Sequence, residues 1–410
     1  MYNQTKYLGL YFLPSALIVG PFLSDFIISI YALYFLYFSI KEKLFYYYKN
    51  YFFYLFIFFY SYILLRSLLS GNPLLSLESS LFYFRYYLFI ACIAHFIEKN
   101  KKFIFNFGVS IFIPILIVSF DAYFQLITSF NITGLKRPDS LHITSFFGSE
   151  MILGQYIARL SPLLIATMLY YDDNKKLSSY IFVFIILILT TSVSYISGER
   201  TAFFISVLSF VMYALLIRNF IGGRLIFLIS LIGIIVSISF LFPNTHNRIF
   251  NHTLTQIDYQ EGNFYVFSKK HQSIYETSLE MIKDKPLFGY GPKMYREECK
   301  RYENSLADPC STHPHNSYLQ LLSETGIIGF IPFFIILIIL VRRVVIYFFM
   351  SFSNQSDKKD FFSNYEISLL IALSITFFPL IPSLNFFNNW ISIIYYLPAA
   401  FLLNINKVKK

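Results

Sequence analysis

The chain has 410 residues, of which 56% are hydrophobic and only 14% are charged, and its mean hydropathy is +0.56. Soluble proteins carry about 25% charged residues, so this composition excludes an ordinary soluble enzyme. The formal net charge of +10 falls largely in short loops between apolar segments, which is typical of membrane topology rather than of nucleic-acid binding. We therefore expect membrane lipids, and no nucleic acid, among the partners.

Apolar segments recur along the whole chain. A helix needs about 20 apolar residues to cross a bilayer, and helices satisfy their own backbone groups there. We predict an all-α polytopic membrane protein with about twelve transmembrane helices in a single membrane domain, 1–410. A polar stretch, 243–316, precedes the C-terminal spans in 317–410. The predicted spans are 8–21, 25–40, 51–69, 80–97, 103–127, 151–171, 179–196, 201–217, 225–242, 319–341, 365–381 and 387–403.

Lys and Arg are distributed unevenly between the short loops, and this asymmetry predicts the orientation. With the N-terminus inside, eighteen of them fall in cytoplasmic segments, and only Lys136, Arg137 and Arg200 fall in short outer loops. We expect both termini to lie in the cytoplasm. The stretch 243–316 is then an external loop, which faces the periplasm in a Gram-negative cell.

Ionisable residues inside the predicted spans gather toward the outer side. Intramembrane charge is costly and marks a functional site by default. A pairing of Arg85 with Asp121 that merely joins helices is the structural alternative. Several cations on one side favour a site for an anionic substrate at the outer leaflet, whereas a transporter would place charge near the midplane. The residues concerned are Arg66, Arg85, Asp121, Arg159, Glu199 and Arg200.

The external stretch contains a predicted surface helix. Tyr275, Leu279 and Ile282 recur at three- and four-residue spacing, so we expect a helix over 272–285 that lies along the membrane. A basic cluster that includes Arg296 follows it, and such a cluster is also typical of a solvated face. Lys136 and Arg137, in an earlier outer loop, are either part of a lid or ordinary solvated charges.

Cys299 and Cys310 lie in the external stretch and can form a disulfide if that compartment is oxidising. Cys310, His313 and His315 also have a spacing that is compatible with metal ligands. A zinc site would need a fourth ligand or a water, and no second cluster of ligands offers itself. We therefore expect no metal.

The stretch from His313 to Gly329 ends the external loop and opens an apolar segment, so its histidines should lie where water meets the bilayer. An imidazole with a pKa near 6.5 is a competent general base near neutral pH. His315 is therefore a candidate base, although a histidine at the end of a loop is often structural.

This stretch resembles the signature of the O-antigen ligase family. His315-Asn316 is followed after nine residues by Gly326 and after two more by Gly329, and all the fixed positions of the signature match. The family usually has an Arg just before the loop helix, where this chain has Lys269-Lys270-His271. Other runs similar to the wider ligase and polymerase superfamily are Ser197-Gly198-Glu199-Arg200-Thr201-Ala202, Phe147-Gly148 and Met281-Ile282-Lys283-Asp284-Lys285-Pro286-Leu287-Phe288-Gly289-Tyr290-Gly291.

The resemblance implies a metal-independent, inverting glycosyltransferase without a cofactor. Such enzymes take a glycan from undecaprenyl pyrophosphate at the outer leaflet and transfer it to an acceptor hydroxyl. His315 would be the base and Arg200 would bind the departing pyrophosphate, because a guanidinium pairs bidentately with phosphate. Arg137, Arg159 and Arg296 are secondary ligands for that anion, and the supporting residues are His313, Asn316, Glu324, Gly326 and Gly329.

The sequence leaves several functions open. The complete signature favours a ligase whose acceptor is lipid A-core. A polymerase that joins carrier-linked repeat units has the same requirements, and some members of the superfamily glycosylate proteins. A transporter or flippase of lipid-linked sugars would need a paired repeat and charge in both leaflets. A purely structural scaffold would not need arginines in the outer half of its spans.

Overall fold

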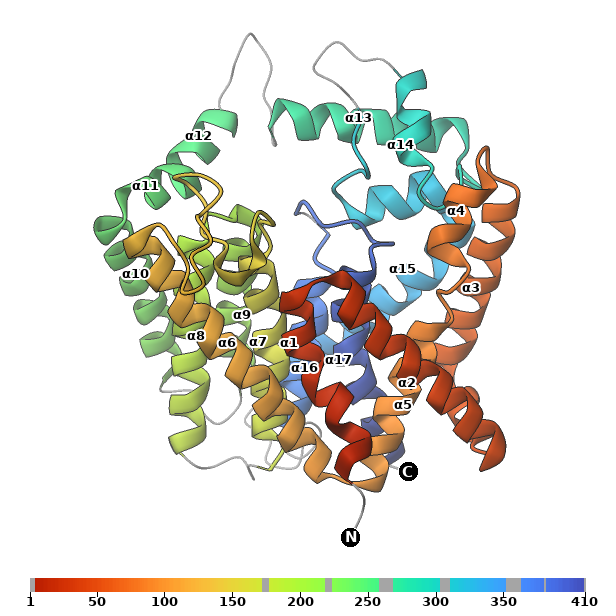
Figure 1. Ribbon diagram of the computed structural model, residues 1–410, viewed down its shortest axis with the longest axis horizontal. Helices are drawn as coiled ribbons and strands as arrows, with labels where there is room; N and C mark the ends of the chain where they lie inside the picture. The colour runs from red at the N-terminus through yellow and green to blue at the C-terminus, as the bar shows by residue number, and fades with distance from the viewer. Residues whose placement is uncertain are drawn as a thin grey trace.

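The computed structural model describes residues 4–171, 177–217, 223–257, 268–302, 310–351, 363–379 and 381–408. Within these ranges the chain consists of helices and loops, with one isolated bridge between Phe130 and Lys136 (Figure 1). The predicted all-α class is confirmed. Some basic residues that predicted the orientation lie outside the described residues, namely Lys175, Lys176, Arg218, Lys358, Lys359, Lys409 and Lys410.

Every predicted apolar segment overlaps a helix. The segment predicted at 80–97 begins later, at Arg85, because a short helix, α4, and a turn precede it. The segment predicted at 319–341 is the longer helix α15. The helices are α1 (Leu8–Val19), α2 (Pro21–Lys41), α3 (Tyr51–Leu68), α4 (Pro73–Ser80), α5 (Arg85–Lys99), α6 (Lys102–Thr128), α7 (Leu153–Leu169), α8 (Leu177–Ile196), α9 (Arg200–Leu216), α10 (Arg224–Leu241), α15 (Ser317–Ser351), α16 (Asn364–Thr376) and α17 (Asn389–Val408).

Seven helical stretches of the described chain are long and apolar enough to cross a membrane, and five shorter apolar helices accompany them. The protein therefore has the character of a multi-pass membrane protein, and the count of twelve spans stays a prediction. The seven stretches are Pro21–Lys41, Tyr51–Leu68, Pro73–Lys99, Lys102–Thr128, Leu177–Ile196, Arg224–Leu241 and Ser317–Ser351.

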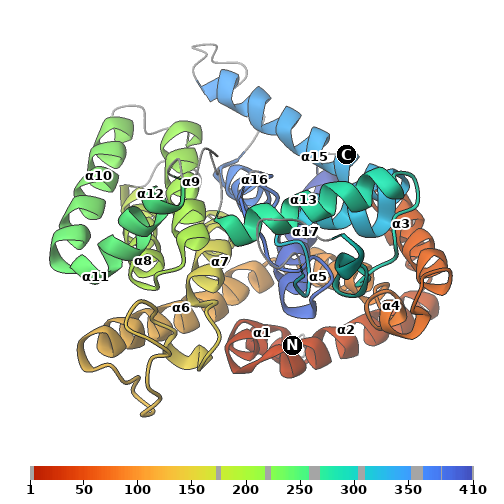
Figure 2. The same ribbon diagram turned by 90° about the horizontal axis from the view of Figure 1, so that it is seen from above.

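The helices of the polar stretch lie over one end of the bundle. Figure 1 shows them across the top, whereas α1 begins and α17 ends at the opposite end. Seen from above, α13 crosses over α15, on which it packs (Figure 2). These helices are α11 (Pro243–His246), the π-helix η5 (Asn247–Asn251), α12 (His252–Ile257), α13 (Lys269–Asp284), α14 (Tyr295–Glu298) and the 3-10 helix η6 (Cys299–Arg301).

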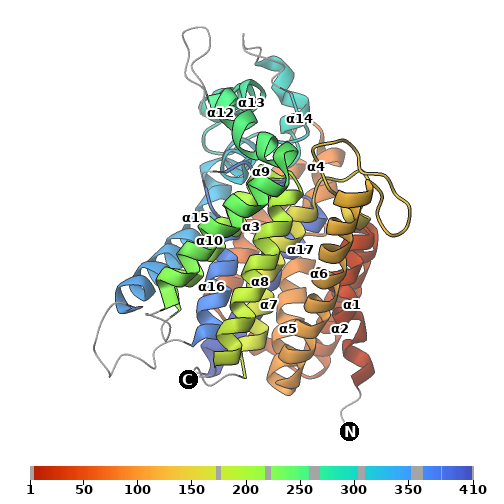
Figure 3. The same cartoon turned by 90° about the vertical axis from the view of Figure 1, so that its left-hand side faces the viewer.

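Burial separates central from peripheral helices. Nearly all residues of α5, α7 and α16 are buried, and α16 packs on α7 while α17 packs on α5. Outer helices instead expose large apolar side chains, such as Phe22, Ile127 and Phe240, which is the surface expected against lipid tails. Seen from the side, α10 and α15 slant away from the other helices toward the lower end (Figure 3).

The pairing of Arg85 with Asp121, which the sequence left open as a structural alternative, is not formed. Arg85 pairs with Asp25 of α2, with 2.7 Å between Nη2 and Oδ1. Asp121 is buried and accepts hydrogen bonds from the N–H of Ile132, at 2.7 Å, and from the Ser145 hydroxyl. The physical reason is that the loop after α6 folds back on this helix and supplies Asp121 with donors.

Candidate active site

Asn316 lies directly before helix α15, which begins at Ser317. Its Oδ1 accepts hydrogen bonds from the backbone N–H groups of Tyr318, at 2.9 Å, and Leu319, at 3.2 Å. These are donors that have no partner within the first turn of a helix. The Asn316 amide also donates to the carbonyl of Pro379 at 3.0 Å. The side chain therefore fixes the start of α15 and, with it, the preceding His315.

Gly326 interrupts α15 with φ of 63° and ψ of −174°, a conformation that only glycine adopts without strain. A Cβ added at Gly326 would lie 2.3 Å from the carbonyl oxygen of Leu287. After the interruption, the N–H of Ile327 donates to the carbonyl of Pro286 at 2.9 Å. The glycine of the motif thus lets the loop after α13 dock directly on the α15 backbone.

The loop segment 286–291 completes this docking. The N–H of Gly291 donates to the carbonyl of Glu324 at 2.7 Å. Gly289 has φ of 65°, and a Cβ there would lie 2.5 Å from the carbonyl carbon of Glu324. The segment around Gly289 and the segment around Gly326 are far apart in the sequence, and they contact each other through their backbones.

Helix α3 also bonds to both of these docked segments. The Tyr62 hydroxyl donates to the carbonyls of Phe288, at 3.0 Å, and Thr325, at 2.8 Å. Gly329 lies under this tyrosine, since an added Cβ would be 2.8 Å from the Tyr62 ring. The second glycine of the motif therefore makes room for α3.

Glu324 is fully buried and orients its neighbours. Its Oε1 accepts from the N–H of Tyr295 at 3.2 Å, and its Oε2 accepts from Nε2 of Gln320 at 3.1 Å. Tyr295 begins α14, the short helix that carries Arg296. Glu324 therefore has the geometry of a positioning residue.

His315 lies in the loop directly before α15, with φ of 54°. Its carbonyl accepts a hydrogen bond from the N–H of Ser383 at 2.7 Å, and its Nε2 lies 3.0 Å from the hydroxyl of Ser311. The side chain is partly exposed. The backbone is thus held in an uncommon conformation that aims the imidazole at a hydroxyl group.

Two further histidines surround His315, and we call the three the histidine cluster. The ring of His313 lies 4.1 Å from that of His315, and the ring of His271 lies 5.4 Å from it, between centroids. Sequence reasoning did not include His271 in the site. In the structure, Ser268 caps α13, and the Ser268 hydroxyl lies 2.7 Å from Nδ1 of His271.

The cluster is neutral near pH 7. Burial, and then the charge of the neighbouring His315, lowers the pKa of His313 to about 3. Burial, and then the charges of His271 and Lys270, lowers the pKa of His315 to about 4. Burial followed by Arg200 and Lys270 lowers the pKa of His271. A neutral His315 keeps a lone pair with which to accept a proton.

Arg200 begins α9 at the edge of the cluster. Its Nη1 donates to the hydroxyl of Thr253 at 3.3 Å, and its charge acts on His271. The preceding Glu199 anchors the turn by accepting from the N–H of Gly154 at 2.6 Å. The charge of Arg200 thus helps to lower the pKa of His271, whose ring lies 5.4 Å from that of His315.

Arg296 reaches the cluster from the loop. Its Nη2 donates to the carbonyl of Thr312 at 3.3 Å, and its charge acts on His313. A disulfide joins Cys299, directly after α14, to Cys310, which opens the segment that leads to the histidines. The disulfide that the sequence allowed between Cys299 and Cys310 is therefore formed.

Arg159 and Arg137 lie elsewhere. Arg159 is fully buried, with its Nε bonded to Oε1 of Gln155 at 3.0 Å and its Nη1 bonded to the carbonyl of Thr376 at 3.3 Å. Arg137 lies in the loop after α6, where its N–H donates to the carbonyl of Ser129. Among the described residues, neither arginine shares a hydrogen bond or ion pair with the histidine cluster.

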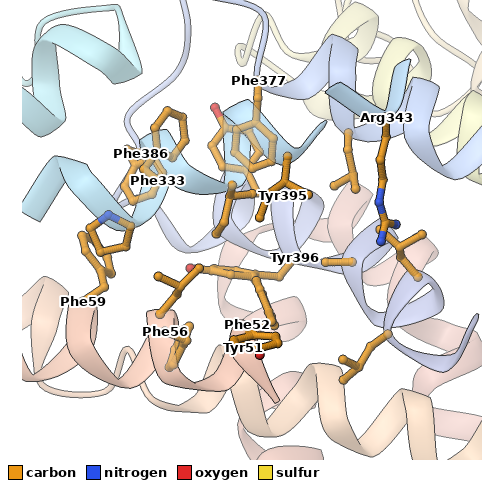
Figure 4. Close-up of a pocket in the computed structure, with 18 residues that line it drawn as sticks. Tyr51, Phe52, Phe56, Phe59, Phe333, Arg343, Phe377, Phe386, Tyr395 and Tyr396 are labelled. Atoms are coloured by element: carbon orange, nitrogen blue, oxygen red, sulfur yellow. The ribbon is translucent and has the colours of Figure 1, made fainter. Parts of the chain in front are cut away.

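An apolar cavity of about 330 Å³ lies between α3, α15, α16 and α17 (Figure 4). Phe59, Phe333, Phe377 and Tyr395 are among the aromatic residues that line it. The hydroxyl of Tyr318, in the first turn of α15, donates to the carbonyl of Phe377 at 2.5 Å. The rim of the cavity is therefore connected to the helix that follows the histidine cluster.

In the described part of the chain, no group of three or more His, Cys, Asp or Glu residues is arranged to hold a metal ion. The chemically distinctive groups of the site are instead three neutral imidazoles with arginines around them. This arrangement can accept a proton and bind an anion side by side.

Comparison with known proteins agrees with this arrangement. A family model described as O-antigen ligase matches residues 181–334, the part of the chain that contains Arg200, Arg296 and the histidine cluster. No match is found among curated proteins. Members of this family are glycosyltransferase-like enzymes, and the family implies lipid-linked glycan substrates. The match over residues 181–334 supports the resemblance of the chain to the O-antigen ligase-like superfamily.

Proposed function

We propose that the protein is an O-antigen ligase, which transfers a glycan from undecaprenyl pyrophosphate to a hydroxyl of lipid A-core at the outer leaflet of the inner membrane. The observation that carries the proposal is the 3.0 Å contact between Nε2 of His315 and the hydroxyl of Ser311. An acceptor hydroxyl that replaces Ser311 would meet a neutral base at hydrogen-bonding distance.

The proposed reaction is a single displacement with inversion. The acceptor oxygen bonds to the anomeric carbon of the glycan while Nε2 of His315 takes the hydroxyl proton. The bond from that carbon to the pyrophosphate oxygen breaks, and its electron pair leaves with undecaprenyl pyrophosphate. The departing group gains negative charge, so fixed cations stabilise the transition state more than the ground state.

We assign this anion first to Arg200 and then to Arg296, because both act electrostatically on the histidine cluster. Arg137 and Arg159 rank behind them because neither is among the charges that lower the pKa of a histidine in the cluster. The protein's own cations supply the required charge, so the proposed reaction uses no metal and no cofactor.

The apolar cavity under Phe377 suits part of the polyprenyl chain of the donor. Its lining is almost wholly aromatic and aliphatic, and such a surface favours a hydrocarbon over water. A donor whose chain entered between α3 and α15 would have its pyrophosphate near the outer end of α15.

The test is glycan transfer by purified protein that is supplied with a polyprenyl-pyrophosphate glycan and lipid A-core, with and without EDTA. We expect modified lipid A-core in both conditions, and loss of the product in Arg200→Ala. Lys283→Ala is the control, because its ammonium is 71% exposed in a surface ion pair with Glu280, whose side chain is 55% exposed.

The acceptor is decided by the same assay. If lipid A-core is ignored and carrier-linked repeat units become longer, the protein is a polymerase and the ligase proposal is wrong. If EDTA abolishes transfer, the metal-independent part of the proposal is wrong.

A further inference from the structure

A second pocket, of about 550 Å³, lies between the end of α3 and the loop segment that follows α13. Tyr62, Leu65, Arg66 and Leu69 line it on the α3 side, and residues 284–289 line it on the loop side. The Tyr62 hydroxyl and the Arg66 guanidinium both donate to carbonyls of that loop segment, so hydrogen bonds join the two walls. The reaction proposed above makes no use of this pocket.

One part of the lining is apolar and exposed to the surroundings. Leu65, Leu69, Leu287 and Phe288 are between 52% and 65% exposed. Phe58, which lies two turns before Leu65 on α3, is exposed as well. Because a lipid-facing helix presents such apolar side chains to hydrocarbon, the pocket borders a surface that suits acyl chains.

Arg66 supplies the first charge of the pocket. A guanidinium has five N–H donors, and the carbonyls of Gly289 and Leu69 accept three hydrogen bonds from it. Two N–H groups are therefore left for a ligand. Within the described residues, Arg66 forms no ion pair with a carboxylate, so its charge is not neutralised by the protein.

Lys285 and Asp284 supply the other charges. The exposed Lys285 ammonium lies 4.1 Å from the centre of the Tyr290 ring. Asp284, the acid in the lining, accepts hydrogen bonds from the hydroxyls of Tyr290 and Tyr302. With Arg66, the lining holds two cations and one carboxylate, and the net positive charge favours an anionic group such as a phosphate.

The first part of α15 separates this pocket from the proposed base. His315 lies just before Ser317, where the helix begins, and the loop segment of the pocket docks at Gly326. The nine residues 317–325 between these points rise by about 14 Å at 1.5 Å per residue. A group bound in the pocket is therefore too far from His315 to react, whereas a molecule that extends across this distance can present a hydroxyl there.

We propose that this pocket binds the phosphorylated, acylated headgroup of the acceptor lipid. Lipid A is a disaccharide that carries phosphate groups and acyl chains. Its phosphate would meet Arg66 and Lys285, an acyl chain would lie along Leu65 and Leu287, and the core sugars would span the distance to His315. The inference rests on the proposed function for the identity of the acceptor, and it assigns a binding site to that acceptor.

The donor does not suit the same pocket. Its pyrophosphate is attached to the anomeric carbon that reacts, so the pyrophosphate must lie beside the base when the acceptor attacks. In the acceptor, by contrast, sugars separate the reacting hydroxyl from the headgroup that anchors the molecule. The pocket therefore favours an acceptor whose hydroxyl lies several sugars away from its phosphate.

The test is the KM for lipid A-core in the transfer assay with the purified full chain. Lys285→Glu should raise this KM roughly tenfold and leave kcat nearly unchanged, because reversal of the charge removes an attraction and adds a repulsion. Leu287→Ser should also raise KM, and Lys285→Arg should match wild type because it keeps the charge. Lys283→Glu is the matched control, since Lys283 is 71% exposed and does not line the pocket.

A modified acceptor connects the effect to the headgroup. With lipid A-core from which the phosphates have been removed, wild type should show the raised KM of Lys285→Glu, and the variant should show no further change. The inference is overturned if Lys285→Glu raises KM equally for both acceptors, or if it leaves KM for the phosphorylated acceptor unchanged. Normal kcat and an unchanged Tm in Lys285→Glu exclude misfolding as the cause of a raised KM.

Direct binding separates lipid A from other anionic lipids. Wild type in phosphatidylcholine nanodiscs should bind lipid A that lacks its core, and Lys285→Glu should bind it roughly tenfold more weakly. If phosphatidylglycerol competes for the Lys285-dependent binding as strongly as lipid A itself, the pocket is a general site for anionic lipids and the inference is wrong.

Failure of this inference differs from failure of the proposed function. If glycan is transferred to lipid A-core with a KM that is independent of Lys285 and Leu287, the ligase proposal stands and the inference is wrong. If lipid A binding depends on Lys285 but no glycan is transferred to lipid A-core, the headgroup site stands and the ligase proposal is wrong.

Discussion

The guanidinium of Arg66 donates two hydrogen bonds to the carbonyl of Gly289, from Nε at 3.1 Å and from Nη2 at 2.8 Å. This contact ties α3 to the loop segment that docks on the interruption of α15. The predicted outer-side cation Arg66 therefore holds the backbone that supports the site.

Arg66→Ala should lower the stability of the protein by about 2 kcal/mol, since hydrogen bonds from a charged group contribute about 1.5–3 kcal/mol. We expect a fall of a few degrees in Tm in detergent and a matching loss of transfer activity. Lys283→Ala, in an exposed ion pair with Glu280, serves as the control. An unchanged Tm and full activity in Arg66→Ala would show that the hydrogen bonds from Arg66 to Gly289 do not hold the loop in place.

Gly326→Ala should be among the most damaging single methyl additions in the chain. The added Cβ would meet the Leu287 carbonyl at 2.3 Å, and the backbone conformation costs a non-glycine residue about 1–3 kcal/mol in addition. Gly233→Ala in α10 is a matched control, because nothing lies within 4 Å of its Cβ position. We expect loss of activity in the first variant and none in the second, measured as transfer rate and yield of folded protein.

The Cys299–Cys310 disulfide should support activity by holding the segment before His315 in place. It fixes the start of the segment in which Ser311 contacts His315 and Thr312 accepts from Arg296. A double Cys→Ser variant should lose about 2–4 kcal/mol of stability and should transfer glycan more slowly. Wild type treated with a reductant should behave in the same way, and Cys92→Ala should remain as sensitive to reductant as wild type. A double variant with normal activity would contradict this role.

The sequence predicted the long helices well, because hydropathy and length determine which segments are stable in a bilayer. It also predicted that His315, Gly326 and Gly329 belong together, because the motif is local. Three features depended on contacts between distant segments and were not predictable from periodicity. These were the pairing of Arg85 with Asp25, the docking of Gly289 on Glu324, and the return of α13 over α15, which brings His271 to the site.

Stability should depend on pH through His313. Its folded-state pKa is about 3, whereas the unfolded chain binds a proton near the ordinary value of 6.5. Between these values the unfolded state binds more protons, so stability falls as pH decreases from about 6.5 toward 3. His313→Gln should flatten this dependence in a series of Tm measurements. If Tm depends on pH in His313→Gln as strongly as in wild type, the dependence comes from groups other than His313.

The central claim is that His315 is the base. The most direct measurement is the rate of glycan transfer by His315→Ala and His315→Gln against wild type, with His252→Ala as the histidine control. A positioned general base contributes about 10²–10⁴-fold, so we predict a loss of that size in both His315 variants and none in the control. For wild type, kcat/KM should stay high down to about pH 5, because the pKa of His315 is about 4. Transfer at the wild-type rate by a folded His315→Ala would contradict the account.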